Sequence, residues 1–427
     1  MFDVVIIGGG PAGSTAAALL AAAGRDVVLL EKETFPRFHI GESLLPFNVQ
    51  LFRRLGVADQ IDARFIQKWG AQIFSSDGSV NRYICFADGM VPGHPMAFHV
   101  LRSRFDELLL LNAAGRGADV RQAREVVEAR GSHRDGWVIT SRGADGQTST
   151  LRARFLLDAS GRDAFIASRG RLRRMSPHLR KAAVFAHFTG VARDEGRAAG
   201  DIILIVLRDG WFWMIPLPDG VTSVGLVAEG SRLKEIGLSP ERTLEEALRR
   251  CPAARPRMEG SRRVSPVWSA SDYSYECRGI AGDGYLLLGD AAAFIDPIFS
   301  TGVWLAMSSG ELAADALHAA LGGGGRAADL SPSVFASYER AVRRHVRGYT
   351  RIVSRFYQPG FMDVFLAPSS RFKIKEAVIS LLAGLSEPSL PVAFRIWCFY
   401  TVVALHRRIG IVPRRVPLLG VLEEASV

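Results

Sequence analysis

Three glycines near the start of the chain have the spacing of a loop that binds a dinucleotide. Gly8, Gly10 and Gly13 form the pattern Gly-x-Gly-x-x-Gly. In such a loop the first glycine permits a tight turn, the second lets the backbone approach a pyrophosphate, and the third lets a helix pack closely on a strand. Glu31, further along, can accept hydrogen bonds from ribose hydroxyls. The pattern therefore predicts a dinucleotide cofactor.

The elements that must hold this loop are visible on both sides of it. Residues 2–7 are a short apolar run of the kind that forms a strand buried on both faces. Residues 14–23 are rich in Ala and Leu and predict a helix, and residues 27–31 predict the next strand. The start of that helix offers free N–H groups and partial positive charge to phosphates. Ala12 in the loop and Lys32 after the second strand are also expected to contact the cofactor.

A second glycine turn with an aspartate lies much later in the chain. Residues 285–288 predict a strand that ends at Gly289 and Asp290, and residues 296–302 lead into a helix. This segment resembles the second FAD fingerprint of the flavoprotein hydroxylase superfamily. The resemblance implies that Asp290 holds the ribityl chain. It also implies that the helix beginning near Gly302 points its N-terminus at the flavin pyrimidine.

Two segments between these turns resemble further motifs of the same superfamily. Residues 156–161, which include Asp158, resemble its middle motif, and residues 101–106, which include Arg102, resemble its arginine-containing helix start. Either segment alone is equally well explained as a strand end or a helix cap. Because four such motifs follow one another in the superfamily's order, the sequence predicts FAD as the cofactor.

One hexapeptide points to a single family within this superfamily. Residues 211–216 read Trp-x-Trp-x-Ile-Pro, the signature of flavin-dependent halogenases. Residues 41–46, which include Ser43, resemble the strap near the flavin in that family. Lys68 lies where the family has its catalytic lysine, and residues 296–302 resemble its halide-site loop. The chain is therefore similar to flavin-dependent halogenases, and this similarity extends over residues 1 to about 320.

The resemblance implies a reaction and assigns residues to it. FADH₂ activates oxygen, and a chloride or bromide held by the backbone N–H groups of Thr301 and Gly302 is oxidised to hypohalous acid. Lys68 then orients this oxidant as an ammonium, or forms a haloamine as a neutral amine, and an electron-rich aromatic ring is halogenated. Burial of such a lysine would lower its pKa. In the family, the wall formed here by Trp211 and Trp213 separates the substrate from the flavin.

One residue departs from the pattern of the tryptophan-specific members. Those members have a glutamate where this chain has Phe299. Members that act on phenols and pyrroles also lack the glutamate. The departure predicts a substrate of phenol or pyrrole type, free or tethered to a carrier protein, and it predicts that free tryptophan is not halogenated.

Other functions on the same scaffold remain open from the sequence. In an aromatic-ring monooxygenase, Trp211 and Trp213 would be incidental. A prenyl-chain reductase related to geranylgeranyl reductases typically has Tyr/Phe-x-Trp-x-Phe-Pro, so Trp211 and Ile215 argue against it. A flavoprotein that only binds or senses would leave Lys68 and the halide loop without a role.

Composition limits the class of protein. The 427 residues are 48% hydrophobic and 22% charged, which is typical of a globular chain of two or three domains. Four cysteines occur without a Cys-x-x-Cys pair, so we predict no metal site and a reduced, cytoplasmic compartment. The N-terminus has no signal-peptide pattern, and no run of 18 uncharged apolar residues predicts a membrane span.

The predicted fold is α/β. We expect a Rossmann-like FAD-binding domain of the aromatic hydroxylase and glutathione reductase type within residues 1–330, an inserted antiparallel substrate-binding sheet, and a helical C-terminal region. Apolar runs at 201–207 and 221–227 predict strands of the inserted sheet. The expected boundaries are 1–75, 98–175 and 276–330 for the FAD-binding part, 76–97 and 176–275 for the sheet, and 331–427 for the helical region.

The positive charge of the chain is concentrated in its last part. Residues 340–427 hold 14 Lys and Arg against 5 Asp and Glu, whereas the preceding residues hold 39 against 38. This distribution argues against a nucleic-acid binder, in which basic residues would follow a whole binding face. Residues 391–405 are strongly apolar but too short to span a membrane comfortably, and Arg407 and Arg408 follow them.

Three interpretations of this tail stay open. It could be a helical cap over the substrate cavity, an anchor at a membrane surface with arginines on anionic headgroups, or a dock for an acidic carrier protein. The chain has no second Rossmann fingerprint. That absence fits FADH₂ supply by a separate flavin reductase, although hydroxylases of this superfamily bind NAD(P)H without one.

Overall fold

The structure, a computed structural model, describes residues 1–176, 179–271, 274–322, 329–367, 371–412 and 416–422. It confirms the first predicted unit as β1 (Phe2–Ile7), α1 (Pro11–Ala22) and β2 (Val27–Leu30). The two strands pair in parallel. The helix begins at Pro11 rather than Ser14. Proline fits the first helical position because its φ is already helical and its missing N–H would have no partner there.

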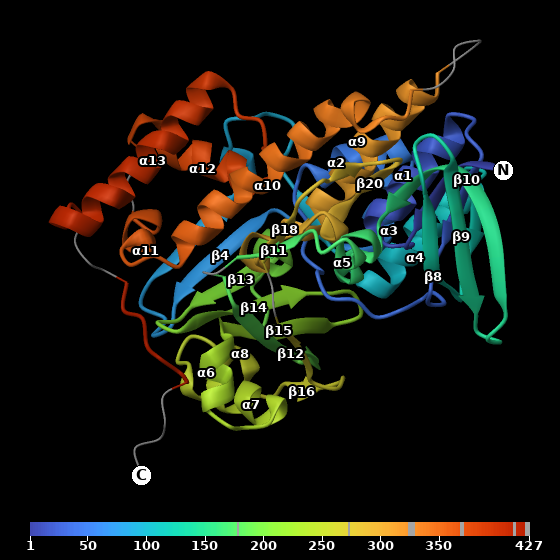
Figure 1. The fold of residues 1–427 in the computed structure, drawn as a ribbon. Coiled ribbons are helices and arrows are strands. Elements are labelled where there is room, and N and C mark those ends of the chain that lie inside the picture. The colour runs from blue at the N-terminus through green and yellow to red at the C-terminus, as the bar shows by residue number, and fades with distance from the viewer. Residues whose placement is uncertain (177–178, 272–273, 323–328, 368–370, 413–415, 423–427) are drawn as a thin grey trace.

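Eight strands of the described chain form the sheet around this unit (Figure 1). Six lie in the order β19 (Ala281–Gly282), β20 (Tyr285–Leu287), β10 (Thr148–Asp158), β1, β2 and β7 (Asp119–Arg121). The remaining two, β8 (Arg124–Ser132) and β9 (Gly136–Gly143), extend from β10 as an antiparallel hairpin. Ile7 pairs with both Leu30 and Asp158, so the parallel strands end at one edge, where open parallel sheets bind ligands.

Helices cover this sheet at close range. The first helix, α1, packs against α9 (Gly302–Leu321) and α4 (Arg102–Gly115). The approach of α1 and α9 depends on Gly310, because a Cβ there would lie 2.5 Å from the carbonyl O of Ala12.

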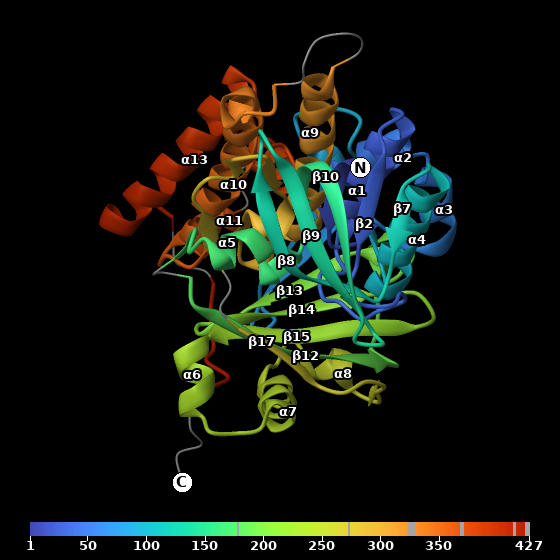
Figure 2. The ribbon, with the colours of Figure 1, turned by 45° about the vertical axis from the view of Figure 1, so that its right-hand side comes forward.

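A second sheet lies below the first, with eight strands in the described residues (Figure 2). Their order is β16 (Arg262–Arg263), β12 (Lys181–Thr189), β15 (Val221–Glu229), β14 (Gly210–Pro216), β13 (Ile202–Val206), β4 (Gly70–Ser75) and β5 (Asn81–Cys85), with β17 (Trp268–Ser271) also on β12. All neighbours are antiparallel except β13 and β4, which are parallel.

The second sheet begins slightly before the boundary expected near residue 76. Its strand β4 covers residues 70–75. The predicted strands at 201–207 and 221–227 are confirmed as β13 and β15. Division of the chain into independently folding domains stays a prediction.

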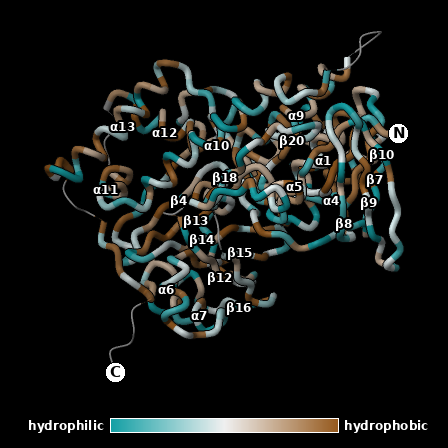
Figure 3. Tube along the Cα trace, in the orientation of Figure 1, coloured by the Kyte–Doolittle hydropathy of each residue, from teal (hydrophilic) through white to brown (hydrophobic). Residues whose placement is uncertain are grey.

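The two faces of this sheet have different neighbours. Phe212 and Met214 of β14 face a core closed by α7 (Pro240–Arg250), and α6 (Gly230–Glu235) and α8 (Arg255–Met258) lie on the same side. Trp211 and Trp213 point the other way, into the core shared with the first sheet. Hydrophobic stretches run along these strands in Figure 3.

Three pairings of short strands and several helices connect the two large sheets to the segments around the site. The short strands are β3 (Ile66–Lys68) with β6 (Ala97–His99), and β18 (Tyr275–Cys277) between β11 (Arg173–Met175) and β21 (Ala293–Phe294). The remaining helices before residue 330 are α2 (Asn48–Leu55), α3 (Ala58–Arg64) and α5 (Phe165–Arg169).

The C-terminal region is helical, as predicted. It consists of α10 (Ala336–Phe356), α11 (Phe361–Phe365), α12 (Ile374–Leu382) and α13 (Leu390–Ile409). In Figure 1 the last three gather at one end of the molecule beside α10. Within the described ranges no helix has both the length and the apolarity to cross a membrane. Arg414, Arg415 and most of the glycine run at 322–325 lie outside those ranges.

Candidate active site

The glycine loop at the end of β1 has the geometry that its spacing predicts. Gly8 has φ of +100°, and a Cβ there would lie 2.4 Å from the carbonyl O of Ala159. A Cβ on Gly13 would lie 2.0 Å from the carbonyl O of Gly8, so this position packs the helix onto the strand end. These two glycines are required by the local backbone alone.

Gly10 is different, because open space surrounds it. A Cβ there would meet only Arg37 Nη2, at 3.6 Å. The Arg37 guanidinium lies 4.6 Å from the ring centroid of Phe35, and its Nη1 lies 3.3 Å from Asp106 Oδ2. That buried Nη1 has no hydrogen-bond partner in the described part of the chain. A cationic group with an unused donor beside an open glycine loop fits a pyrophosphate. Arg37 was not among the predicted residues.

The acidic residue after β2 supports the loop. Glu31 is buried, and its carboxylate accepts hydrogen bonds from the N–H groups of Gly9 (2.6 Å) and Glu33 (2.8 Å). Lys32 points elsewhere: its half-exposed side chain forms a 2.6 Å ion pair with Asp163, and this hydrogen bond raises the pKa of Lys32. Contact of either side chain with the cofactor stays a prediction.

Two further predicted cofactor residues, Arg102 at the start of α4 and Asp158 at the end of β10, make hydrogen bonds that mostly hold backbone. Arg102 forms a two-pronged ion pair with Asp106 (2.7 and 2.8 Å) and donates to the carbonyl O of Ile40 (2.7 Å). It thereby ties α4 to the start of the strap at residues 41–46. Asp158 accepts hydrogen bonds from the N–H and hydroxyl of Ser160 and the N–H of Ile166. These contacts hold the backbone around the site, and contact of Arg102 and Asp158 with the cofactor stays a prediction.

The second glycine turn leaves its aspartate available. Gly289 has φ of +54°, and its N–H donates to Ser309 Oγ of α9 at 2.8 Å. The backbone of the next residue, Asp290, is fixed by Tyr275, whose hydroxyl donates to its carbonyl O at 2.7 Å. Desolvation raises the pKa of Asp290 to about 6, opposed by the charge of Arg102. A carboxylate held this way fits the ribityl hydroxyls predicted for it.

Lys68 is buried, with 2% of its side chain exposed. Its Nζ donates hydrogen bonds to Ser43 Oγ (2.9 Å) and to the carbonyl O of Leu44 (3.1 Å), and it lies 5.1 Å from the ring centroid of Phe86. Burial lowers the pKa of Lys68 to about 7, and the charge of Asp201 opposes this shift. Ser43 was predicted as a cofactor residue; in the structure it is the hydrogen-bond partner of the lysine.

Lys68 lies in the wall of a cavity of about 400 Å³, a volume that includes solvent at its mouth. The cavity lies between the strap, the second sheet, the halide loop and the C-terminal region. It is lined by Leu45, Lys68, Ala71, Ile73, Ile84, Phe86, Ile202, Leu204, Ile298, Phe299, Ser300 and Leu382. The structure thus brings the predicted lysine and the predicted halide loop to one space. Phe86 and Leu382 were not predicted.

The halide loop ends at the start of α9. Thr301 is fully buried, and its Oγ1 has no hydrogen-bond partner in the described residues. Gly302 is the first residue of α9, so its N–H has no acceptor within the helix, and no atom would lie within 4 Å of a Cβ placed there. An unused hydroxyl and a free helix N-terminus together suit an anion.

The two tryptophans form a pair on the inner face of β14. Their ring centroids are 5.7 Å apart. Trp213 fills the space opposite Gly225 of β15, where a Cβ would lie 2.2 Å from the indole, and its Nε1 donates to Ser223 Oγ at 3.1 Å. The Nε1 of Trp211 donates to the hydroxyl of Tyr357 at 2.9 Å. Neither indole is among the residues that line the cavity beside Lys68.

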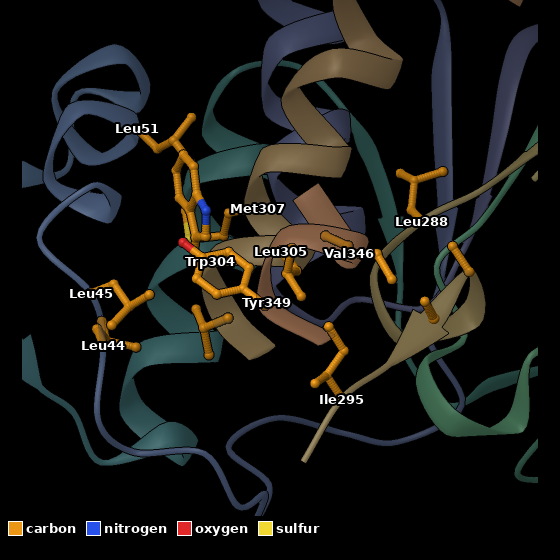
Figure 4. Close-up of a cluster of buried hydrophobic side chains, with 14 of the residues drawn as sticks. Leu44, Leu45, Leu51, Leu288, Ile295, Trp304, Leu305, Met307, Val346 and Tyr349 are labelled. Atoms are coloured by element: carbon orange, nitrogen blue, oxygen red, sulfur yellow. The ribbon is translucent and has the colours of Figure 1, made fainter. Parts of the chain in front are cut away.

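A buried apolar cluster joins these parts. Figure 4 shows Leu44 and Leu45 of the strap, Trp304 and Leu305 of α9, and Tyr349 of α10 in this cluster. Packing of this kind fixes the strap against the helix that follows the halide loop.

Comparison with known proteins places the chain in a family. Residues 1–351 match the model of the FAD binding domain family, so this protein is a FAD-binding oxidoreductase. It is 31% identical over 406 residues to a 1H-pyrrole-2-carbonyl-[peptidyl-carrier protein] chlorinase of Pseudomonas fluorescens, a match that spans 90% of this chain and 89% of the relative. It is 34% identical to a tryptophan 2-halogenase of Chondromyces crocatus, over 83% of this chain and 67% of that protein. The chain belongs to the flavin-dependent halogenases.

Solved structures agree with the predicted fold. The flavin-dependent brominase Bmp2 superposes with a TM-score of 0.83 at 27% identity, over 95% of this chain and 99% of that one. A flavoprotein/dehydrogenase from Cytophaga hutchinsonii superposes with a TM-score of 0.87 at 29% identity, over 95% and 98%. These superpositions include the C-terminal helices, whereas the sequence motifs had shown resemblance to the halogenases only up to about residue 320.

The described residues fit FAD and the family's chemistry. Gly10 and Gly302 border open space, and Arg37 Nη1 and Thr301 Oγ1 are buried polar atoms without a hydrogen-bond partner in the described residues. Bound reduced flavin would supply two of the four electrons that oxygen accepts, and a halide would supply the other two as it is oxidised to hypohalous acid. The protein itself excludes water with the apolar cavity and presents one amine, Lys68, inside it.

Proposed function

We propose that this halogenase modifies an electron-rich aromatic ring of phenol or pyrrole type that reaches the cavity without charged groups of its own. The lining of the cavity is the observation on which this depends. Ten of its twelve residues are apolar, and the polar ones are Lys68 and Ser300. A free amino acid would place an ammonium and a carboxylate in this space, where burial of unpaired charge is costly.

Pyrrole-2-carboxylate has no ammonium, and tethering to a carrier protein removes its carboxylate charge because the carboxyl group becomes a thioester. The names of two similar proteins, the pyrrole-carbonyl chlorinase and a pyrrole-carbonyl brominase of Pseudoalteromonas luteoviolacea that is 34% identical, specify a peptidyl-carrier protein. Phe299 supports the same proposal, since it places an aromatic ring where tryptophan-specific members have a carboxylate.

The test is a comparison of substrates under one set of conditions. The enzyme would receive FADH₂, oxygen and bromide with free tryptophan, free pyrrole-2-carboxylate, a simple phenol, and pyrrole-2-carbonyl thioester on a carrier protein. Mass spectrometry should find halogen on the tethered pyrrole or the phenol and none on free tryptophan. Halogenated free tryptophan as the main product would overturn the proposal.

We also propose that a separate flavin reductase supplies the FADH₂. The support is that the sequence contains one Gly-x-Gly-x-x-Gly fingerprint, used for FAD. The enzyme alone should not oxidise NADPH or NADH above background, and halogenation should begin when a reductase is added. Steady NADPH consumption by the enzyme alone would contradict this.

The peripheral membrane contact predicted for the C-terminal region remains a second proposal, about location only. Its support is one face of α13, where Phe394 and Trp397 are 62% and 60% exposed and Arg407 and Arg408 follow in the last turn. Exposed aromatics next to arginines suit an anionic lipid surface. Flotation with phosphatidylglycerol vesicles should be lost in Phe394→Ser/Trp397→Ser; a full-length protein that never floats would exclude it.

A further inference from the structure

Tyr357, the residue that follows α10, connects this helix to the active site through its hydroxyl. Its hydroxyl accepts a hydrogen bond from Trp211 Nε1 (2.9 Å) and donates one to Asp296 Oδ2 (2.9 Å). Trp211 belongs to the tryptophan wall, and Asp296 begins the halide loop. One hydroxyl therefore connects two parts of the site that lie far apart in the sequence.

Asp296 is the residue that shapes the halide loop. Its side chain is fully buried, its Oδ1 accepts the N–H of Ile298 at 3.1 Å, and its own N–H donates to Ser274 Oγ at 3.1 Å. Burial raises the pKa of Asp296 to about 6, opposed by Ile298, Tyr357 and the charge of Lys181. At neutral pH the carboxylate is therefore mostly ionised, and Tyr357 donates to a charged acceptor, which makes a stronger bond.

A second contact from the same helix end supports the loop. Phe356 packs edge-on against Phe299 with ring centroids 5.6 Å apart, and Phe299 lines the cavity beside Lys68. The ring centroid of Tyr357 itself lies 4.0 Å from Lys181 Nζ, which pairs with Glu229. Tyr357 is thus held by its ring as well as by its hydroxyl.

We propose that Tyr357 is a positioning residue for halide oxidation, because its hydroxyl fixes the halide loop at a constant spacing from the tryptophan wall. It touches neither of the two predicted halide ligands, Thr301 and Gly302; it acts through Asp296. The proposal rests on the halide chemistry of the family and adds a residue from a region that the sequence motifs left unassigned.

The physical argument concerns what happens without the hydroxyl. Asp296 Oδ2 and Trp211 Nε1 would both lose a buried partner, and leaving a buried polar group unpaired is costly. Either the loop and the wall move until each finds another partner, or water enters between them. Both outcomes disturb the place where the halide must lie when oxygen is reduced.

Two overall reactions then compete. Productive turnover is FADH₂ + O₂ + X⁻ + H⁺ → FAD + HOX + H₂O, in which oxygen takes two electrons from the flavin and two from the halide. Unproductive turnover is FADH₂ + O₂ → FAD + H₂O₂, in which the flavin alone is oxidised. Misplacement of the halide loop shifts oxygen from the first reaction to the second.

The experiment compares Tyr357→Phe with Tyr400→Phe. Tyr400 is a buried tyrosine of α13 that stacks on Arg355 (4.5 Å) and takes no part in the bridge between Trp211 and Asp296. Each protein is loaded with FAD, reduced, and mixed with oxygen and bromide, and trapped hypobromous acid and hydrogen peroxide are counted per FADH₂. In Tyr357→Phe the amount of trapped hypobromous acid per FADH₂ (the trapped fraction) should fall about tenfold, a loss of the size seen when a residue that orients a ligand is removed. The bromide KM should rise.

A second readout needs no cofactor and no activity. Hydrogen exchange measured by mass spectrometry on the FAD-free proteins should show faster exchange of the peptide around residues 293–305 in Tyr357→Phe and not in Tyr400→Phe. The effects of Tyr357→Phe and Trp211→Phe on the yield of trapped hypobromous acid should not add, because both variants lose the hydrogen bond between Trp211 and Tyr357.

The outcomes separate this proposal from the halide chemistry on which it rests. Unchanged exchange of the loop, or an unchanged trapped fraction in Tyr357→Phe, overturns the positioning role. Equal losses in Tyr357→Phe and Tyr400→Phe would also overturn it, because any disturbed C-terminal tyrosine would then have the same effect. If the unaltered enzyme traps no hypobromous acid while its loop exchange still depends on Tyr357, the halide chemistry fails and the structural bridge stands.

Discussion

Lys68 donates to two acceptors at once, Ser43 Oγ at 2.9 Å and the carbonyl O of Leu44 at 3.1 Å. A neutral amine has two N–H donors and one lone pair, so these two bonds use both donors and leave the lone pair free. Burial lowers the pKa of Lys68 to about 7. The neutral form is therefore well populated near neutral pH, which favours the haloamine role over the ammonium role.

Halogen transfer should depend on pH through this amine. Below pH of about 7 Lys68 is protonated and has no lone pair, so transfer to the aromatic substrate should fall up to tenfold for each further pH unit. The measurement is halogenated product per trapped hypohalous acid at pH 5.5 to 8.5. Transfer that instead declines as pH rises through 7 would assign the ammonium role.

The same lowered pKa predicts how stability changes with pH. Between pH 7 and about 10 the unfolded chain binds the Lys68 proton and the folded protein does not, so the free energy of unfolding rises with pH. Relative to Lys68→Met, the unaltered protein should gain on the order of 1 kcal/mol per pH unit in this window. Urea unfolding of both proteins at pH 7, 8.5 and 10 gives the difference. If the free energies of unfolding of the two proteins change with pH by the same amount, Lys68 has an ordinary pKa in the folded state.

Thr301→Val should raise stability and impair the reaction. The buried Oγ1 of Thr301 has no partner in the described residues, and removal of an unsatisfied hydroxyl stabilises a protein by about 1 kcal/mol. If the hydroxyl helps to bind the halide, the bromide KM should rise about tenfold while FAD affinity is unchanged, and Thr301→Ser should behave normally. Loss of activity in Thr301→Ser together with Thr301→Val would point to packing instead.

Gly225→Ala tests the tryptophan wall. A Cβ at this position would lie 2.2 Å from the Trp213 indole, so the indole must shift, at a cost of about 1–3 kcal/mol. The fraction of oxygen released as hydrogen peroxide should increase. Gly348→Ala is the control, because no atom would lie within 4 Å of its new Cβ. If the indole is displaced and the fraction of oxygen released as hydrogen peroxide does not change, the tryptophan wall has no part in linking oxygen reduction to halide oxidation.

Arg37→Ala should weaken FAD binding by roughly tenfold, the effect of about 1.4 kcal/mol expected from one charged contact to phosphate. The residue lies beside the open Gly10 with an unused buried donor. Lys32→Ala should have little effect, since Lys32 is half-exposed and paired with Asp163. Flavin fluorescence titration of the two variants measures both affinities, and the opposite ranking would contradict this assignment.

The sequence was sufficient for the parts of the site that depend on backbone geometry. Gly8 and Gly13 could be predicted because positive φ and close packing at a strand end leave glycine as the residue that fits. Lys68 was predicted from family resemblance. Its burial could not be predicted, because the cavity around it is built by β4, β5 and β13 of the second sheet together with Phe86 and Leu382 of α12.

Other residues gave no local signal. Arg37 and Tyr357 act through partners on distant segments, Asp106 and Asp296, and nothing in their own neighbourhood marks them. Strand β4 pairs with β13, which lies far away in the sequence, so no local pattern marks the residue at which the second sheet begins. Gly225 did have a local signal, because a glycine within a strand of larger residues indicates that another group, here the Trp213 indole, lies close to the backbone.

The central claim is that this protein oxidises a halide and passes the halogen through Lys68. The most direct test reduces the bound FAD without oxygen, then mixes it with oxygen, with and without bromide, in the presence of a hypohalous-acid trap. We predict bromide-dependent trapped halogen in both the unaltered enzyme and Lys68→Met, with halogenation of the aromatic substrate lost at least about 100-fold in the variant. Oxidation of FADH₂ that ignores bromide and yields no trapped halogen would contradict the account.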